Sequence, residues 1–296
     1  MRITLLANRD LHSNYALNLL LPRLTNDHSL TLLLSDTVGG SSAQQADLQW
    51  LHFLEQTLCN DVLFPTLDRV GATGELLTFS ALGTFLEHPW ASLNNPNSEA
   101  GLAALAASNP DLLLCLRYGR ILQPTAISIP PRGVLNLHSG RLPQYRGVMA
   151  TFRAMLAGDS LLGTTLHWIE DASIDTGGIV NIHSKSLDPQ RCYLGNVLSL
   201  YDTGCAAIID ALHALSANQN LERYPARGAG DYFSFPSASD CRAFRSAGYL
   251  WADPAFLATV LQRYQPPVET GIALGLPPID LSEAGLLTLY RAAVHP

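Results

Sequence analysis

Hydrophobic positions in the first part of the chain follow two alternating patterns. Short apolar runs of strand length lie at residues 2–7, 30–34 and 111–116. The last of these is continuous, as expected of a strand covered on both faces of a parallel sheet. Between them, apolar residues are dense at 15–24, and residues 43–58 carry leucines at three- and four-residue spacing. Such spacing predicts amphipathic helices, so the chain begins in the order strand, helix, strand, helix.

The second half of the chain continues this alternation. Residues 133–138, 163–169 and 178–183 have the pattern of strands, and residues 194–215 predict one long helix. Strands that alternate with helices build a sheet with helices on both faces. The sequence therefore predicts an α/β fold with a doubly wound, Rossmann-like, mostly parallel sheet.

The pattern changes near residue 217. We expect one large domain at residues 1–217 and a small C-terminal appended region at residues 218–296. The appended region contains the aromatic segment 232–236, a short helix that ends near Gly248 and a second helix that opens at Asp253.

Composition narrows the class of protein. The chain has 296 residues, is 47% hydrophobic and 15% charged, and therefore has enough apolar residues for a folded core. Its formal net charge is -7, and every basic residue except Lys185 is an arginine. The appended region has six arginines (223, 227, 242, 245, 263 and 291), no lysine and a slight excess of acids. This charge distribution argues against nucleic acid as a partner.

The cysteines and the apolar runs exclude other classes. Five scattered cysteines without a C-x-x-C pair favour neither a disulfide framework nor a zinc site. No apolar stretch approaches the roughly 18 residues of a membrane span, and the short run after Arg2 is too brief for a signal peptide. We expect a cytoplasmic protein that does not associate with membranes.

Candidate chemistry gathers at predicted strand ends. Asn136 and His138 lie two residues apart, and because side chains in a strand alternate with period two, both point to the same face. They come at the carboxyl end of their strand, where open α/β sheets bind ligands. Asp175 precedes a Thr-Gly-Gly turn between two later strands. An amide, an imidazole and a carboxylate form a coherent set for acid/base chemistry, since the carboxylate favours the charged imidazole.

Positive charge is concentrated around the same strand. No acidic residue lies between Asp111 and Asp159, whereas that stretch holds six arginines: Arg117, Arg120, Arg132, Arg141, Arg146 and Arg153. This reversal of local charge predicts a site for an anionic group of a substrate or cofactor.

Three other sites are disfavoured. His138, His167 and His183 fit no metal-ligand spacing, so no metal is expected. Ser139 has no G-x-S-x-G context and, next to His138 on a strand, points to the opposite face, which argues against a serine hydrolase. The turn at residues 7–13 contains no glycine, which argues against a dinucleotide site.

Four motifs, in order and with matching spacing, resemble the 10-formyltetrahydrofolate-dependent formyltransferases. They are the N-x-H strand end at 136–138, the L-P-x-Y-R-G loop at 142–147, the G-x-T-x-H strand at 163–167 and the I-D-T-G turn at 174–177. The resemblance covers roughly residues 75–217 and extends to the catalytic domains of sugar N-formyltransferases and methionyl-tRNA formyltransferases.

This resemblance implies roles for individual residues. Asn136, His138 and Asp175 become the catalytic residues, and His167 becomes a partner of Asp175. The pocket for the pterin ring of the co-substrate, 10-formyltetrahydrofolate, is expected to be lined by Arg117, Tyr118, Gly119, Arg120, Ile121, Leu122 and Asp171. From the arginine-rich stretch, Arg141 and Arg146 are assigned to substrate binding together with Tyr145.

The resemblance also implies an activity. We expect transfer of a formyl group to the primary amine of a small-molecule acceptor, either a nucleotide-linked amino sugar or an amino-acid-like metabolite. Three alternatives remain open at this point: a methionyl-tRNA formyltransferase, a 10-formyltetrahydrofolate hydrolase and a non-catalytic folate-binding module. A homodimer is compatible with the sequence.

Overall fold

A seven-stranded sheet forms the centre of the molecule. The structure, a computed structural model, describes residues 1–36, 45–226, 228 and 230–294, so the first two residues of the predicted helix 43–58 and Arg227 lie outside the described residues. The strands lie side by side in the order β3-β2-β1-β4-β5-β7-β8. Their bounds are β1 Arg2–Asn8, β2 Ser29–Ser35, β3 Ala91–Ser92, β4 Leu112–Leu116, β5 Val134–His138, β7 Leu161–Ile169 and β8 Ile179–Ser186.

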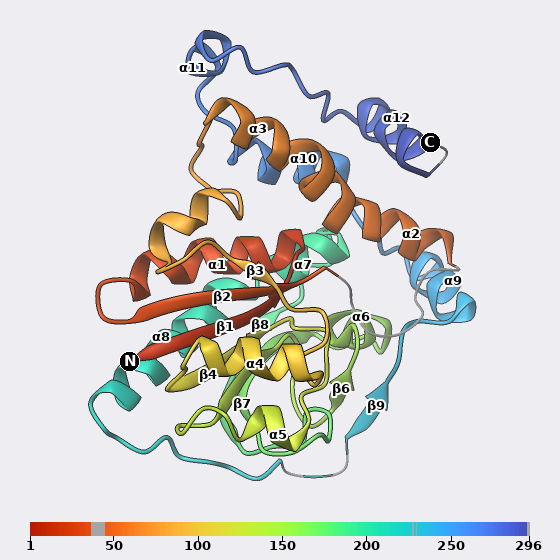
Figure 1. The fold of residues 1–296 in the computed structure, drawn as a ribbon. Coiled ribbons are helices and arrows are strands. Elements are labelled where there is room, and N and C mark those ends of the chain that lie inside the picture. The colour runs from red at the N-terminus through yellow and green to blue at the C-terminus, as the bar shows by residue number, and fades with distance from the viewer. Residues whose placement is uncertain (37–44, 227, 229, 295–296) are drawn as a thin grey trace.

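The predicted α/β fold is confirmed. The first five strands of the sheet run parallel, and β7 and β8 are added antiparallel at one edge. Helices α1 (Leu11–Leu24) and α8 (Tyr201–Ser216) pack on one face, while α4 (Glu99–Ala107) and α5 (Pro124–Ile127) cover the other (Figure 1). The sheet is therefore mostly parallel and covered by helices on both faces, as the alternation of patterns predicts.

Side-chain alternation along the central strands produces two apolar layers. On β1, Leu5 belongs to the larger core beneath α1 and α8, whereas its neighbour Leu6 belongs to the smaller core beneath α4 and α5. β4 divides in the same way, with Leu114 and Leu113 on opposite faces. Because successive strand side chains point to opposite faces, a continuous apolar run is what two buried faces require.

The predicted helix at 43–58 is longer and less regular than its leucine spacing indicates. One continuous helical segment runs through α2 (Ala46–His52), the π-helix η1 (Phe53–Leu63) and α3 (Phe64–Val70). It ends at Gly71, which has φ of 64°, a left-handed conformation that favours glycine. A π-helix is rare and often marks a functional site, and this one faces the cleft described below.

The predicted helix 194–215 is two helices. α7 (Tyr193–Leu198) and α8 are separated at Ser199 and Leu200. The Ser199 hydroxyl donates to the carbonyl of Asn196, 2.8 Å away. A serine side chain that bonds to the preceding turn competes with helix continuation. The apolar periodicity continues across this break, which is why the sequence pattern predicts one helix where the structure has two.

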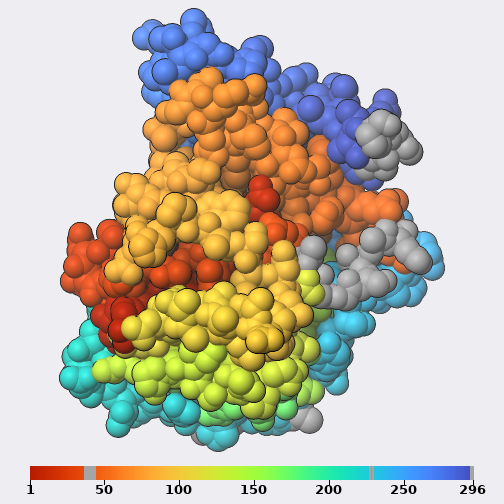
Figure 2. Space-filling view, viewed as in Figure 1, coloured from red at the N-terminus to blue at the C-terminus, as the bar shows by residue number. Residues whose placement is uncertain are grey.

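Residues after 217 pack directly on the sheet domain. Strand β9 (Asp231–Phe233) pairs in parallel with β6 (Tyr145–Gly147), away from the main sheet. Four helices follow: α9 (Ala238–Ser246), α10 (Pro254–Gln262), α11 (Val268–Ala273) and α12 (Glu283–Val294). Buried residues on both sides of residue 217 belong to one continuous core, and the blue C-terminal residues lie against the orange helical segment in Figure 2.

The remaining described elements are short: α6 (Ala150–Leu156), which precedes β7, and the 3-10 helix η2 (Ala81–Phe85). Among the residues that the structure describes, no helix is long and apolar enough to cross a membrane.

Candidate active site

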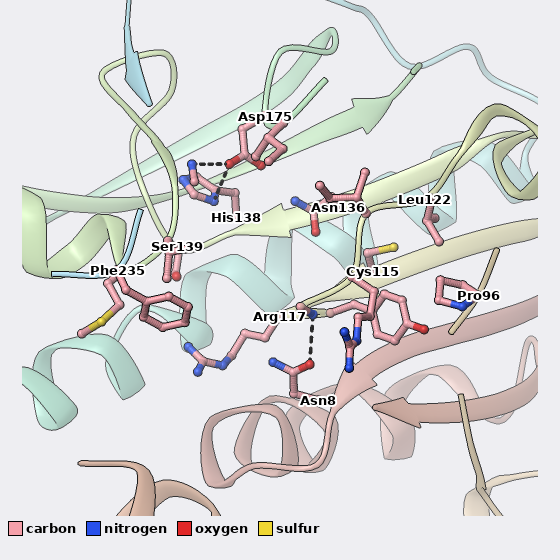
Figure 3. Close-up of a pocket in the computed structure, with 18 of the residues that line it drawn as sticks. Asn8, Pro96, Cys115, Arg117, Leu122, Asn136, His138, Ser139, Asp175 and Phe235 are labelled. Carbon is pink, nitrogen blue, oxygen red and sulfur yellow. Dashed lines mark hydrogen bonds and ion pairs between the residues drawn. The ribbon is translucent and has the colours of Figure 1, made fainter. Parts of the chain in front are cut away.

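A cleft of about 1270 Å³ opens at the carboxyl ends of the central strands. The register pairs Ala7 of β1 with Leu116 of β4, and Leu116 with Leu137 of β5. The residues that follow on the three strands are Asn8, Arg117 and His138. They therefore lie side by side at the cleft, and neighbouring strands are about 5 Å apart. Figure 3 shows these residues around the cleft.

Asn136, His138 and Asp175 come together in this cleft. Asn136 and His138 lie on β5, and Asp175 lies in the turn between β7 and β8. Nδ1 of His138 is 3.5 Å from Oδ2 of Asp175, and His138 is turned towards this carboxylate in Figure 3. The structure thus brings together the three polar groups that the sequence predicts as a set.

The Asp175 carboxylate is held in its charged form. Burial raises its pKa, but the charge of His138, a hydrogen bond from His167 and the backbone N–H of Gly147 together lower the pKa to about 2. The Gly147 N–H donates to Oδ2 at 2.7 Å. Asp175 also has φ of 56°, which aspartate tolerates better than most residues. An anionic carboxylate beside an imidazole favours the imidazolium form.

Both ring nitrogens of His138 face acceptors within the protein. Nε2 lies 2.7 Å from the carbonyl oxygen of Tyr145, and because a carbonyl only accepts, Nε2 carries a hydrogen. Nδ1 faces Asp175. His138 must therefore release the Tyr145 carbonyl before Nε2–H can donate to a substrate oxygen. Space for the ring in its present position depends on Gly140, where a Cβ would lie 2.6 Å from Nε2.

His167 connects Asn136 with Asp175. Its Nδ1 donates to the carbonyl of Trp168 at 2.9 Å, and its Nε2 lies 3.0 Å from Nδ2 of Asn136 and 3.4 Å from Oδ1 of Asp175. The neutral ring accepts from the Asn136 amide, whereas the protonated ring donates to Asp175. His167 therefore contacts two of the three predicted catalytic side chains rather than Asp175 alone.

The predicted pterin-pocket residues all line the cleft. These are Arg117, Tyr118, Gly119, Arg120, Ile121, Leu122 and Asp171. The segment after β4 is anchored by two hydrogen bonds: the Gly119 N–H donates to Oδ1 of Asn8 at 2.9 Å, and the Tyr118 hydroxyl donates to the carbonyl of Leu93 at 2.7 Å. The Arg117 side chain, however, points to Asp10 at the start of α1 and not to the pterin side.

The three residues predicted to bind substrate do not line the cleft. Arg141 packs against Gly163. The hydroxyl of Tyr145 donates to Asp159, and the guanidinium of Arg146 donates to the carbonyl of Gly230. The placement of these side chains gives no support to a role in acceptor binding.

Of the six arginines predicted to form an anion site, Arg117 and Arg120 line the cleft and the other four do not. Arg132 donates to the carbonyl of Leu215 and to Asn218, and Arg153 pairs with Asp240. Like Arg141 and Arg146, they do not line the cleft. The absence of acids in the local sequence gave no information on partners, because the acids that pair with these arginines lie far away along the chain.

A second wall of the cleft is formed by α2 and η1, for which the sequence motifs predict no function. The residues of α2 and η1 that line it are Leu48, Leu51, His52, Glu55, Gln56, Thr57, Asn60 and Asp61. One signal in the sequence marks it: Glu55 lies four residues after Leu51 and four before Cys59, where the apolar face of a helix continues. An acid at such a position is buried, and burial of an acid usually has a specific reason.

Comparison with known proteins gives a family match over part of the chain. Residues 72–191 match the formyl transferase family. The methionyl-tRNA formyltransferase of Cereibacter sphaeroides (strain KD131) is 33% identical over 174 residues, which cover 59% of this chain and 53% of the relative. The chain thus spans about half the length of the curated relatives it matches. The predicted resemblance to the formyltransferase family is confirmed over residues 72–191.

Solved structures share the fold. A sugar N-formyltransferase from Shewanella sp FDAARGOS_354 has a TM-score of 0.53 and 14% identity, with 83% of this chain and 88% of that chain covered. The N-formyltransferase from Helicobacter canadensis, in complex with folinic acid and dTDP-3-aminofucose, has a TM-score of 0.50 and 14% identity, with 81% of this chain and 72% of that chain covered. At this identity, the likeness concerns the fold alone.

Proposed function

We propose that this protein transfers the formyl group of 10-formyltetrahydrofolate to the primary amine of a small acceptor, either a nucleotide-linked amino sugar or an amino-acid-like metabolite. The observation that carries the proposal is the convergence of Asn136, His138 and Asp175 at one cleft, with a 3.5 Å contact between His138 and Asp175. The folinic acid in the complex of the Helicobacter canadensis protein and the size of the cleft support a folate co-substrate.

Asn136 and His138 stabilise charge on the formyl oxygen in this proposal. When the amine attacks the formyl carbon, negative charge develops on that oxygen. An amide N–H of Asn136 and Nε2–H of protonated His138 are donors on the same face of β5. Such donors act as an oxyanion hole, and the loss of one typically costs about 10²–10³-fold in turnover.

Asp175 has two tasks. Its carboxylate, with its pKa lowered to about 2, faces Nδ1 of His138 and stabilises positive charge that develops on that ring. The attacking nitrogen acquires a positive charge when it bonds to carbon, and the Asp175 side of the cleft takes up a proton from it. The N10 atom of the folate gains one proton as its bond to the formyl carbon breaks, so a carboxylate that passes protons on balances this step.

A methionyl-tRNA acceptor is the second candidate. The names of the curated relatives favour it. The appended region disfavours it, since its six arginines are outnumbered by acids and its Arg245 and Arg263 pair with Asp47 and Glu75. Phosphate-rich partners require unpaired positive charge.

The test is turnover of 10-formyltetrahydrofolate by the purified protein with a panel of acceptors: dTDP-3-aminofucose, other nucleotide amino sugars, free amino acids and methionyl-tRNA. Tetrahydrofolate formation that depends on a small amine is the expected result. Turnover with methionyl-tRNA alone favours the second candidate. Turnover without acceptor indicates a hydrolase, and saturable folate binding without turnover indicates a binding module; either result contradicts the proposal.

A further inference from the structure

A buried group of charged side chains lies at the cleft beside the proposed reaction site. Arg117 contacts two carboxylates: its Nη2 is 3.2 Å from Oδ2 of Asp10 and 3.7 Å from Oε2 of Glu55. Its Nε also donates to Oδ2 of Asp10 at 3.3 Å. Asp10 is fully buried and caps α1 through Ser13. Asp10 therefore neutralises Arg117 at close range.

Glu55 is the second carboxylate beside Arg117, in excess of the one that the single guanidinium neutralises. Only 12% of its side chain is exposed, and that part lines the cleft. Among the described residues, no hydrogen-bond donor reaches its Oε1. The nearest nitrogen is Nδ1 of His12 at 3.6 Å, but burial and the charge of Arg117 lower the pKa of His12 well below its usual value. His12 is thus neutral near pH 7 and supplies no charge to balance Glu55.

The surroundings of Glu55 shift its pKa towards neutral pH. Burial raises its pKa to about 8; Arg117 lowers it and Asp10 raises it. The groups that face it come from several elements: Asp10 and His12 from the start of α1, Arg117 from the segment after β4, and Tyr193 from α7. A carboxyl group titrating near neutral pH is a good proton acceptor for an ammonium group, because the efficiency of proton transfer is highest when pKa values are matched.

The position of Glu55 suits an incoming amine. Arg117, its neighbour, follows Leu116, which pairs with Leu137 next to His138, and Glu55 of the π-helix η1 lines the same cleft as His138. Glu55 and the predicted catalytic residues therefore border one cavity from two sides. An amine that approaches His138 from the side of η1 passes this carboxylate.

The proton balance of the reaction requires such a group. A primary aliphatic amine enters as an ammonium ion near pH 7 and has to lose one proton before its nitrogen has an electron pair for attack. It loses a second proton when the new C–N bond forms. The folate N10 takes one proton as its bond to the formyl carbon breaks, so one proton per turnover leaves the enzyme. Asp175 accounts for the second proton; with its pKa lowered to about 2 by His138, His167 and Gly147, it is a weak base for the ammonium ion.

We propose that Glu55 binds the ammonium group of the acceptor and takes its first proton, so that the acceptor is a cationic amine that is deprotonated on the enzyme. Because its pKa is about 8, Glu55 reacts from its ionised fraction. This carboxylate accepts the proton, the neutral amine then attacks the formyl carbon, and protonated Glu55 returns the proton to water through the cleft. The inference rests on the proposed function and names its acceptor-side base.

The test is the pH dependence of kcat/KM for the acceptor in the Glu55→Gln variant, with the amine that supports turnover in the panel above. At pH 7 we expect a fall of about 10²-fold, with the KM for 10-formyltetrahydrofolate unchanged. The deficit should shrink as the pH approaches the acceptor's own ammonium pKa, because free amine then binds without needing a base. Glu87→Gln, the same chemical change at an exposed position, is the control and should match the wild type.

The outcomes separate the inference from the proposed function. Wild-type kcat/KM in Glu55→Gln, or a deficit that is the same at every pH, overturns the role of Glu55 while formyl transfer stands. Absence of turnover by the wild type with every acceptor overturns both. If Glu55→Gln does not fold, Glu55→Asp provides the test: the shortened carboxylate should raise the KM for the acceptor and not that for the folate, and an unchanged acceptor KM rejects the proposal.

Discussion

The two walls of the cleft differ in how their polar groups are satisfied. The wall formed by β5 and the β7–β8 turn lies within the stretch that matches the formyl transferase family. There, the carboxylate of Asp175 has contacts from His138, His167 and Gly147. The opposite wall comes from the first 70 residues, outside that match. There, Glu55 leaves one buried oxygen without a hydrogen-bond donor among the described residues.

This difference separates two tasks. A fully engaged carboxylate with a lowered pKa stays ionised and passes a proton on without retaining it, while a carboxyl group with a raised pKa retains a proton near neutral pH and can gain or lose it. The first arrangement suits a step common to a whole family, the stabilisation of charge at the formyl group. The second suits the acceptor, which differs from one family member to another. The following predictions test this contrast.

The largest expected effect is the loss of Arg117. In Arg117→Met, Asp10 and Glu55 remain buried without a cation, and breaking a buried pair from one side typically costs about 3–5 kcal/mol. Thermal and urea unfolding should show this loss. Arg242→Met, at an exposed position, is the control and should stay within about 0.5 kcal/mol of the wild type. A small effect at Arg117 would mean that water satisfies the two carboxylates.

Replacement of the three predicted catalytic residues should affect turnover far more than stability. Asn136→Ala, His138→Ala and Asp175→Asn are each expected to lower kcat by about 10²–10³-fold while the circular dichroism spectrum stays native. Single-turnover kinetics with 10-formyltetrahydrofolate provide the measurement. Wild-type rates in all three variants would reject this wall as the site of chemistry.

Stability should respond to pH in opposite directions for the two buried carboxylates. The pKa of Asp175 is lowered from 3.8 to about 2, so its contribution is present above pH 4 and is lost as the pH falls towards 2, an effect of about 2 kcal/mol. The pKa of Glu55 is raised, so the folded state holds its proton more tightly and stability falls as the pH rises from about 4.5 to 8.

Urea unfolding across this pH range is the measurement. Asp175→Asn should lose the acid-side dependence and Glu55→Gln the neutral-side dependence, each without the other. If both variants follow the wild-type curve, the two walls do not differ in the way their pKa values indicate.

The smallest effect is expected at Gly140. A Cβ in Gly140→Ala would lie 2.6 Å from Nε2 of His138 and 2.4 Å from Cβ of Ala150, so the imidazole has to shift. An overpacking strain of about 1.4 kcal/mol in the reacting state corresponds to a roughly tenfold fall in kcat. Gly83→Ala has open space at its Cβ and should be neutral. Equal activities would show that His138 already acts from another position.

Much of the sheet could be predicted from the sequence, because strand periodicity is a local property. A continuous apolar run such as residues 111–116 by itself predicts a strand that is buried on both faces. The break at Ser199 and the π-helix η1 could not be predicted, since each depends on hydrogen bonds that leave the apolar spacing nearly unchanged. The pairing of β9 with β6 joins residues that are 86 positions apart, and no local pattern encodes such a pairing.

The predictions for the site divide in the same way, into those that depend on local spacing and those that depend on distant residues. Asn136 and His138 share a face through their two-residue spacing, and Asp175 follows from the motif order, so the sequence by itself determined these side chains as a set. The partners of the arginines did not follow, because each depends on a distant acid or carbonyl, such as Asp240 for Arg153.

The sequence by itself determined the α/β fold, the resemblance of residues 72–191 to the formyltransferase family and the three polar groups of one cleft wall, because these depend on short-range spacing along strands and turns. Only the tertiary structure decided that Glu55 faces Arg117 and His12 across the other wall. A charge acquires its partners and its pKa from groups that are neighbours in space and not along the chain. For Glu55, burial against those neighbours converts an ordinary helical acid into the proposed acceptor-side base.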